Sequence, residues 1–320
     1  MFGKENKIVD IRTGWKGRFP KDKRDSIPTP EGYRQGHRLI RIAGEVPATV
    51  LGRLRLSEKS YRNILKAQEL WLSGMEAWIM PKHESDADGP LVGPTLRRVS
   101  REFESAMFLL MGEKILAKRI RGFFAKNWPQ IYTRQVSTPN HKANLSDITQ
   151  SEELISTLLK AGKVAMVFPE GTRSDTGKLG DGIPLLAHYL SDNAFVLPMA
   201  FDGSRERWPK EGKPKWIRGR AIVAYVGEPI LIKDLRREIA EFARASGEEI
   251  LYKEEKALIM DLIMRRGIAP LIQNEDDKGN YKDRNLPLSE ILKQVRERFA
   301  CETAAKRKAV LARRALANTG

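Results

Sequence analysis

Short apolar runs recur along the middle of this chain, and segments with helical spacing separate them. The four clearest runs are AWIMP, VAMVF, AFVLPMAF and AIVAYVG, at Ala77–Pro81, Val164–Phe168, Ala194–Phe201 and Ala221–Gly227. Apolar runs of this length, bounded by turn residues, are typical of buried strands. Strands that alternate with helices predict an α/β fold, with a mixed sheet flanked by helices. We also expect helical extensions at the N- and C-terminal ends.

The helices are expected where apolar residues recur every three or four positions. Ser57 and Ser151 are suited to capping two of these helices, and Gly162 is suited to ending the second one. A weakly alternating run at Ile131–Val136 predicts a further strand. The remaining helices are predicted over Leu96–Leu116, Leu235–Met264 and Leu288–Leu316.

Composition divides the chain into three parts. Residues 1–50 form a polar N-terminal arm, residues 51–233 hold the strands of the α/β domain, and residues 234–320 form a helical C-terminal extension. No run approaches the roughly 18 apolar residues that a membrane span needs, and the N-terminus lacks the apolar core of a secretory signal. The single cysteine, Cys301, excludes an internal disulfide framework and favours a reducing compartment. We therefore expect a cytoplasmic protein without membrane spans.

Net charge indicates what this chain binds. It has 57 Lys and Arg against 41 Asp and Glu, a formal net charge of +16. A strongly basic protein attracts anionic partners, which leaves three classes open: nucleic acid, acidic lipid headgroups and phosphorylated small molecules.

A histidine and an aspartate follow the first apolar run. In PKHESDADGP, His83 and Asp88 are five positions apart, which on one regular helix places them about 140° apart. They can meet only if His83 lies in a loop and Asp88 lies at or near a helix entry, a boundary to which Gly89 and Pro90 are suited. A carboxylate that holds one imidazole nitrogen leaves the other as a general base. A merely solvated polar loop remains an alternative on spacing alone, whereas metal binding lacks HExxH, a second nearby histidine and a cysteine pair.

The second apolar run leads directly into FPEGTRSDTG. Ligands of open α/β sheets bind at the carboxyl ends of strands, which is where this loop lies. Gly171 lets the backbone approach a ligand, Thr172 offers a hydroxyl, and Arg173 is suited to bidentate phosphate recognition. Glu170 is expected to hold an arginine or a ligand hydroxyl, and an ordinary turn with a surface ion pair is the alternative. Arg134, at the end of QIYTR, carries no signal by itself.

Other catalytic signatures are missing. The sequence has no GxGxxG, no GxxxxGK[ST] and no GxSxG. The dinucleotide-binding, P-loop and serine-hydrolase classes therefore lose their main support.

Taken in order, the motifs resemble the four blocks of the glycerolipid acyltransferases, the family that acylates glycerol-3-phosphate and lysophosphatidate. The resemblance covers about residues 70–230, and Lys82 stands where members acting on lysophosphatidate often have Asn. The matching residues are His83 and Asp88 for the first block, Lys114 and Arg134 for the second, FPEGTRS at Phe168–Ser174 for the third, and Pro198 in VLPMAF for the fourth.

This resemblance implies a direct acyl transfer without a covalent enzyme intermediate. It makes His83 and Asp88 the catalytic pair and Arg134 and Arg173 the ligands of the acceptor's phosphate. It places Glu170, Gly171 and Thr172 in the acceptor pocket. No metal and no bound cofactor is required, because acyl-CoA or an acyl-carrier protein arrives as a substrate. The implied acceptor is 1-acyl-glycerol-3-phosphate, with glycerol-3-phosphate as the alternative.

The expected partners follow from the same resemblance and from the charge. We expect a peripheral enzyme on the inner face of the membrane, with the basic and aromatic segment Lys118–Trp128 either on an anionic lipid surface or in the rim of the domain. No nucleic acid is expected. The alternative from another class is a basic module that binds anions or nucleic acid on an inactive scaffold. It is motivated by the charge and by Arg205–Arg220, which carries seven Lys or Arg and two Trp.

Overall fold

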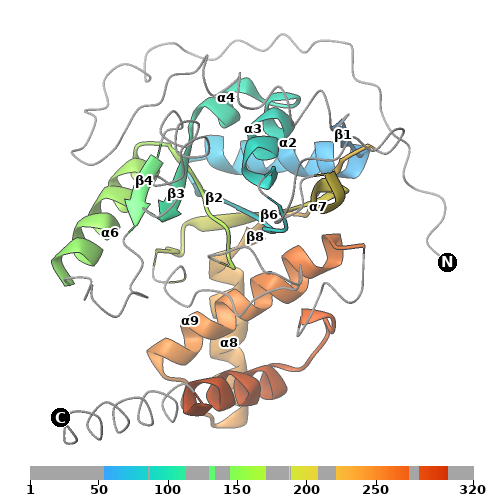
Figure 1. The fold of residues 1–320 in the computed structure, drawn as a ribbon. Helices are drawn as coiled ribbons and strands as arrows, with labels where there is room; N and C mark the ends of the chain where they lie inside the picture. Colours follow the sequence, from blue (N-terminus) through green and yellow to red (C-terminus); the bar gives the residue numbers. More distant parts are fainter. Residues whose placement is uncertain are drawn as a thin grey trace, which may run out of the picture.

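The computed structural model describes residues 54–85, 87–112, 130–133, 145–170, 187, 189–207, 221–273 and 281–301, and only the backbone at 111–112, 130–133 and 145–152. The strands within these residues form one mixed sheet in the order β1-β7-β6-β2-β5-β3-β4, with β8 paired to β6 (Figure 1). Helices flank this sheet, which confirms the predicted α/β class. The strands are β1 (Arg55–Leu56), β2 (Glu76–Pro81), β3 (Met107–Gly112), β4 (Gln130–Thr133), β5 (Val164–Met166), β6 (Ala194–Asp202), β7 (Val223–Val226) and β8 (Ile230–Leu231).

The centre of the sheet is parallel. Neighbouring strands run parallel from β6 through β2, β5 and β3 to β4, whereas β7 and β8 run antiparallel to β6. Ile79 of β2 lies opposite Met166 of β5 on one side and Leu197 of β6 on the other. Because parallel strands end at the same edge, the loops that follow β2 and β5 leave the sheet side by side. That edge is where open α/β sheets bind their ligands.

Both faces of the sheet are buried under helices. Ala77 and Ile79 pack into one hydrophobic cluster, and Trp78 and Met80, which alternate with them along β2, pack into the other. This two-sided burial explains why the strands are apolar runs without polar alternation. The first cluster includes α2 (Glu58–Leu72), α3 (Asp88–Arg97) and α4 (Arg101–Ser105). The second includes α6 (Leu145–Lys160), α8 (Ile232–Ser246), α9 (Tyr252–Leu262), the π-helical η4 (Ile263–Ile268) and the helix at 288–301.

Two of the predicted helix signals are confirmed. The Ser57 side chain accepts a hydrogen bond from the Ser60 backbone N–H at 3.1 Å and caps α2. Gly162, with φ of 74°, follows the end of α6. Its N–H and that of Lys163 donate to the carbonyls of Leu159 and Leu158, the two bonds of a Schellman motif. A left-handed residue is required there, so glycine fits.

Three predicted helices have different bounds in the structure. The continuous helix over Leu96–Leu116 is wrong, because α3 ends at Arg97 and Met107–Gly112 form strand β3. Ser151 does not cap a helix, because α6 already begins at Leu145. The helix over Leu235–Met264 is two helices, because Gly247 ends α8 in the left-handed conformation with φ of 69°. The two short remaining elements are α7 (Ser204–Arg207) and η5 (Ala269–Leu271).

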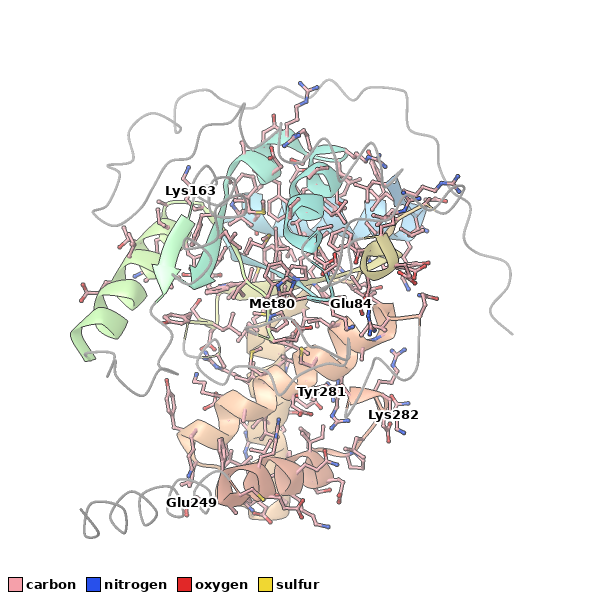
Figure 2. The ribbon with its side chains drawn as sticks, viewed as in Figure 1. Met80, Glu84, Lys163, Glu249, Tyr281 and Lys282 are labelled. Atoms are coloured by element: carbon pink, nitrogen blue, oxygen red, sulfur yellow. The ribbon has the colours of Figure 1, made fainter. Side chains whose placement is uncertain are left out.

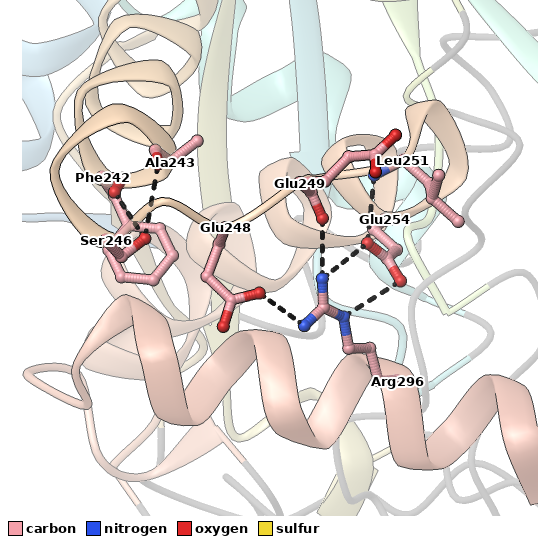
Figure 3. Close-up of polar contacts among 8 residues, drawn as sticks. All are labelled: Phe242, Ala243, Ser246, Glu248, Glu249, Leu251, Glu254 and Arg296. Atoms are coloured by element: carbon pink, nitrogen blue, oxygen red, sulfur yellow. Dashed lines mark hydrogen bonds and ion pairs between the residues drawn. The ribbon is translucent and has the colours of Figure 1, made fainter.

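The C-terminal helices pack directly against the sheet (Figure 1). Gly267 of η4 lies so close to Pro198 of β6 that an added Cβ would come within 3.1 Å of the proline ring. Polar contacts hold these helices to one another. Arg296, from the helix at 288–301, donates to the carboxylates of Glu248 and Glu254 and to the Glu249 carbonyl (Figure 3). The division at residues 233 and 234 into two units stays a prediction.

Within the part of the chain that the structure describes, no helix has both the length and the apolar character that crossing a membrane requires.

Candidate active site

The predicted histidine lies in the loop that leaves β2. The strand ends at Pro81, and the backbone N–H of Lys82 donates to the Met199 carbonyl of β6 at 2.9 Å. This bond ties the start of the loop to the neighbouring strand. His83 follows in a non-helical segment, next to Glu84 (labelled in Figure 2), and Asp88 is the first residue of α3. The structure therefore places His83 in a loop and Asp88 at a helix entry, the arrangement in which residues at this spacing can meet.

The Asp88 carboxylate is buried and fully wrapped by its own loop. Its side chain is 1% exposed. Oδ2 accepts hydrogen bonds from the backbone N–H groups of Glu84 at 2.5 Å and Ser85 at 2.7 Å, and Oδ1 accepts from the Ser85 hydroxyl at 3.1 Å. The same hydroxyl accepts from the Ala87 N–H at 3.0 Å. These bonds, together with its place in the first turn of α3, stabilise a negative charge that has left water.

The imidazole of His83 faces this carboxylate. Nδ1 of His83 lies 3.6 Å from Oδ2 of Asp88, and the His83 side chain is 18% exposed. This separation is an ion-pair distance and exceeds that of a hydrogen bond. Since Nδ1 faces Asp88, Nε2 is the nitrogen left for a substrate. A partly exposed imidazole beside a buried carboxylate is the arrangement of a general base.

The loop after β5 brings two further side chains to His83. The ring of Phe168 stacks on the imidazole, with the centroids 4.0 Å apart and the planes at 24°. The Glu170 carboxylate accepts a hydrogen bond from the His83 backbone N–H through Oε1 at 3.2 Å. Residues about 85 positions apart in sequence meet here because β2 and β5 are neighbours in the sheet.

Glu170 is an unusual carboxylate. Burial raises the pKa of its carboxyl group, whereas hydrogen bonds from its own backbone and from that of His83, and the charges of His83 and Lys82, oppose this shift of the pKa. Oε2 is buried and has no hydrogen-bond partner among the described residues. A buried acceptor without a partner is costly to maintain, so it is suited to receiving a ligand hydroxyl or a cation.

A second ion pair lies beneath the loop. The Lys82 side chain is 1% exposed and pairs with the Glu84 carboxylate. Lys82, Ser85 and Phe168 were not among the site residues predicted from the sequence. The sequence contained a signal for two of them, because Lys82 departs from the family pattern and Phe168 is the first residue of the third motif.

Four of the predicted site residues, Arg134, Gly171, Thr172 and Arg173, lie outside the described residues. Their approach to His83 stays a prediction, as does the lipid contact of Lys118–Trp128, which also lies outside. Within the described ranges, no three His, Cys, Asp or Glu side chains are grouped so that they could hold a metal ion.

Comparison with known protein families places this site in a class of enzymes. Residues 61–200 match the model of the Acyltransferase family, the family of glycerolipid acyltransferases. The matched segment runs from α2 to β6 and includes His83, Asp88 and Glu170. This match confirms the resemblance of the motifs to the acyltransferase family and supports an enzyme that transfers acyl groups. A search of curated proteins found no match.

Proposed function

We propose that this protein is an O-acyltransferase of phospholipid biosynthesis. It moves a fatty acyl group from acyl-CoA, or from an acyl-carrier protein, to the free hydroxyl of 1-acyl-glycerol-3-phosphate. The observation that carries this proposal is the pairing of partly exposed His83 with buried Asp88 inside the acyltransferase domain.

His83 acts as the general base. Nε2 takes the proton from the acceptor hydroxyl while the hydroxyl oxygen attacks the thioester carbon. The C–S bond breaks as the tetrahedral intermediate collapses, and the imidazolium returns its proton to the leaving thiolate. Asp88 faces Nδ1 and stabilises the imidazolium that forms between the two proton transfers. The products are the ester and a free thiol, so the proton balance closes without a metal or a bound cofactor.

The phosphate of the acceptor is held by arginines in this scheme. Arg134 and Arg173 are the proposed ligands, because a guanidinium binds two phosphate oxygens at once. Gly171 and Thr172 line the acceptor pocket next to them. Glu170, whose Oε2 has no partner among the described residues, receives an acceptor hydroxyl or one of these arginines.

The acceptor and product carry acyl chains, so the enzyme works at a lipid surface. We propose peripheral binding to the inner face of the membrane, driven by the net charge of +16 and by the Lys118–Trp128 segment. Electrostatic binding of this kind weakens with salt.

The acceptor is tested by competition. Radiolabelled acyl-CoA is offered with glycerol-3-phosphate and its 1-acyl derivative, the latter in vesicles that contain anionic lipid. We expect label in the diacyl product. Label that enters only the monoacyl product shows a glycerol-3-phosphate acyltransferase instead. No product from either acceptor, with either a CoA or a carrier-protein donor, contradicts the proposal and favours the anion-binding module.

A further inference from the structure

Asp88 alone does not fix the orientation of the His83 ring. Its carboxylate oxygens already accept three hydrogen bonds from Glu84 and Ser85, and Nδ1 of His83 stays at 3.6 Å. The Nδ1 atom has no hydrogen-bond partner among the described residues. A contact at this distance supplies attraction without the directionality of a hydrogen bond. Another contact is needed to hold the plane of the imidazole.

Phe168 supplies a contact with the required geometry. Its ring covers one face of the imidazole at 4.0 Å between centroids, nearly parallel at 24°. A stack restricts rotation of the ring about its own side-chain bonds, because any large rotation breaks the overlap. Aromatic pairs of this kind contribute beyond the area that they bury.

Phe168 is itself held in place. Val167, the residue before it, donates its backbone N–H to the Ile79 carbonyl of β2 at 3.0 Å. The ring also approaches Gly89 at the start of α3, where an added Cβ would lie 3.7 Å from Cζ of Phe168. The side chain packs against the cluster that includes α2, α3 and α4. Phe168 is thus tied through Val167 to β2, the strand that leads into His83, and its ring approaches α3, the helix that begins at Asp88.

We infer that Phe168 is a positioning residue for the proposed reaction, which holds the His83 imidazole in the plane where Nδ1 faces Asp88 and Nε2 faces the acceptor hydroxyl. Glu170 holds the backbone of His83 from the same loop. Phe168 touches no reacting atom and acts only through the imidazole. This inference rests on the proposed function, but the stack itself can be tested without any activity.

The first test measures the ring directly. The sequence has four histidines, so the imidazole resonances of the full chain can be assigned by NMR with His83→Gln as the reference. A ring stacked at this distance shields the imidazole protons. We expect Phe168→Leu to move the His83 resonances downfield and Phe168→Tyr to keep them shielded. His83 resonances that do not respond to Phe168→Leu overturn the inference, whatever the enzyme catalyses.

The second test measures acyl transfer. We expect Phe168→Leu to lower kcat by about 3- to 10-fold, the size of an aromatic contact, and to leave the KM of both substrates nearly unchanged. Phe168→Tyr should recover kcat to the extent that it recovers the NMR shielding. Phe103→Leu is the control, because Phe103 belongs to the cluster against which Phe168 packs and its ring contacts Trp71 instead of His83. It should lower the melting temperature and leave kcat unchanged.

The decisive comparison uses the His83→Ala background. If Phe168 works through the imidazole, Phe168→Leu has no further effect on the residual rate of His83→Ala, because residues that act as a unit are not additive. An equal fold-loss in both backgrounds overturns the inference and leaves Phe168 as part of the substrate pocket. A wild-type chain without transferase activity contradicts the proposed function, while the NMR result still decides the stack.

Discussion

At the scale of single residues, the site depends on a carboxylate that the chain surrounds before any substrate arrives. Asp88 receives two backbone N–H groups and one hydroxyl, all from the two residues that follow His83. The loop is thus shaped around the negative charge. His83 lies in this loop, so we expect loss of the charge to disturb both the fold of the loop and the proposed general base.

We therefore expect Asp88→Asn to lower activity and stability together. An amide keeps one acceptor oxygen, so either the two N–H groups at the Oδ2 position or the Ser85 hydroxyl at the Oδ1 position loses its acceptor, at a cost of about 1–3 kcal/mol. Without the carboxylate the imidazolium loses its stabilising partner, and kcat should fall by about 10²–10⁴-fold. Asp234→Asn is the control, because its carboxylate pairs with Arg237 on the surface of α8 and is half exposed. A wild-type kcat in Asp88→Asn contradicts the role of the carboxylate.

Glu170 makes a prediction about stability and pH. Burial raises the pKa of this carboxyl, so the folded state keeps its proton at pH values where the unfolded state has lost it. The ionised form then destabilises the fold increasingly as the pH rises above about 4.3, the pKa of a free glutamate. Glu170→Gln removes this cost. Its free energy of unfolding should exceed that of the wild type at pH 7 to 8, and the difference should shrink towards pH 4.

The free energies of unfolding are measured by urea unfolding between pH 4 and pH 8. Glu238 is the control, because its effect on stability changes with pH in the opposite direction. The hydrogen bond from Arg266 lowers the pKa of Glu238, so its charge stabilises the fold above the unfolded pKa and this contribution is lost as the pH falls. Glu238→Gln should therefore lose stability at pH 7. A difference between Glu170→Gln and the wild type that stays constant with pH contradicts the effect of burial on Glu170.

At the scale of elements, close backbone packing joins the C-terminal helices to the strand beside β2. A Cβ added to Gly267 would lie 2.8 Å from Cδ1 of Ile230 and 3.1 Å from Cβ and Cγ of Pro198. We expect Gly267→Ala to cost about 1–3 kcal/mol of unfolding free energy, as overpacking does. Gly247→Ala is the contrast. It adds a Cβ into open space and costs about 1–2 kcal/mol through its left-handed backbone alone. A neutral Gly267→Ala contradicts the packing.

The sequence predicted some elements well and others poorly, and the physical reasons differ. The cap of α2 at Ser57 and the end of α6 at Gly162 are local, because each needs only one side chain or one backbone conformation. Strand β3 was missed because a short apolar run such as MFLLMG occurs in both helices and buried strands. Only its pairing with β4 and β5 makes it a strand. Gly247 is a residue type that often ends a helix, but it was missed because the apolar periodicity continues past it into α9.

At the scale of the whole molecule, the helix at 288–301 is joined to α9 through a buried guanidinium. Arg265 is 2% exposed and donates to Asp261 at 2.5 Å, to the Asp283 carbonyl at 3.1 Å and to Gln294 at 2.9 Å. Arg265→Met leaves the buried Asp261 carboxylate with the partly exposed Arg298 at 3.3 Å, so it should cost about 3 kcal/mol, the low end for a broken buried ion pair. Arg296 forms a second and more exposed ion pair from the same helix (Figure 3). Arg296→Met should therefore lower the free energy of unfolding by about 1 kcal/mol or less. Equal losses in thermal or urea unfolding contradict the importance of burial.

The candidate site could be predicted from the sequence only where its contacts are local. The spacing of His83 and Asp88 and the glycine and proline after them are local, so the sequence indicated that the pair could meet at a helix entry, although a merely solvated loop stayed open. The contacts of Phe168 and Glu170 with His83 depend on the neighbouring positions of β2 and β5, which no local pattern indicates. The net charge of +16 predicted an anionic partner and the motifs predicted a phosphorylated glycerolipid, and both stay predictions.

The rate of acyl transfer by His83→Ala tests the central claim most directly. Labelled acyl-CoA and 1-acyl-glycerol-3-phosphate are incubated with the wild type, with His83→Ala, and with His141→Ala, a control histidine outside the motifs. We expect His83→Ala to be about 10²–10⁴-fold slower than the wild type and His141→Ala to match it, with all three equally folded by circular dichroism. Equal rates in His83→Ala and the wild type contradict His83 as the general base.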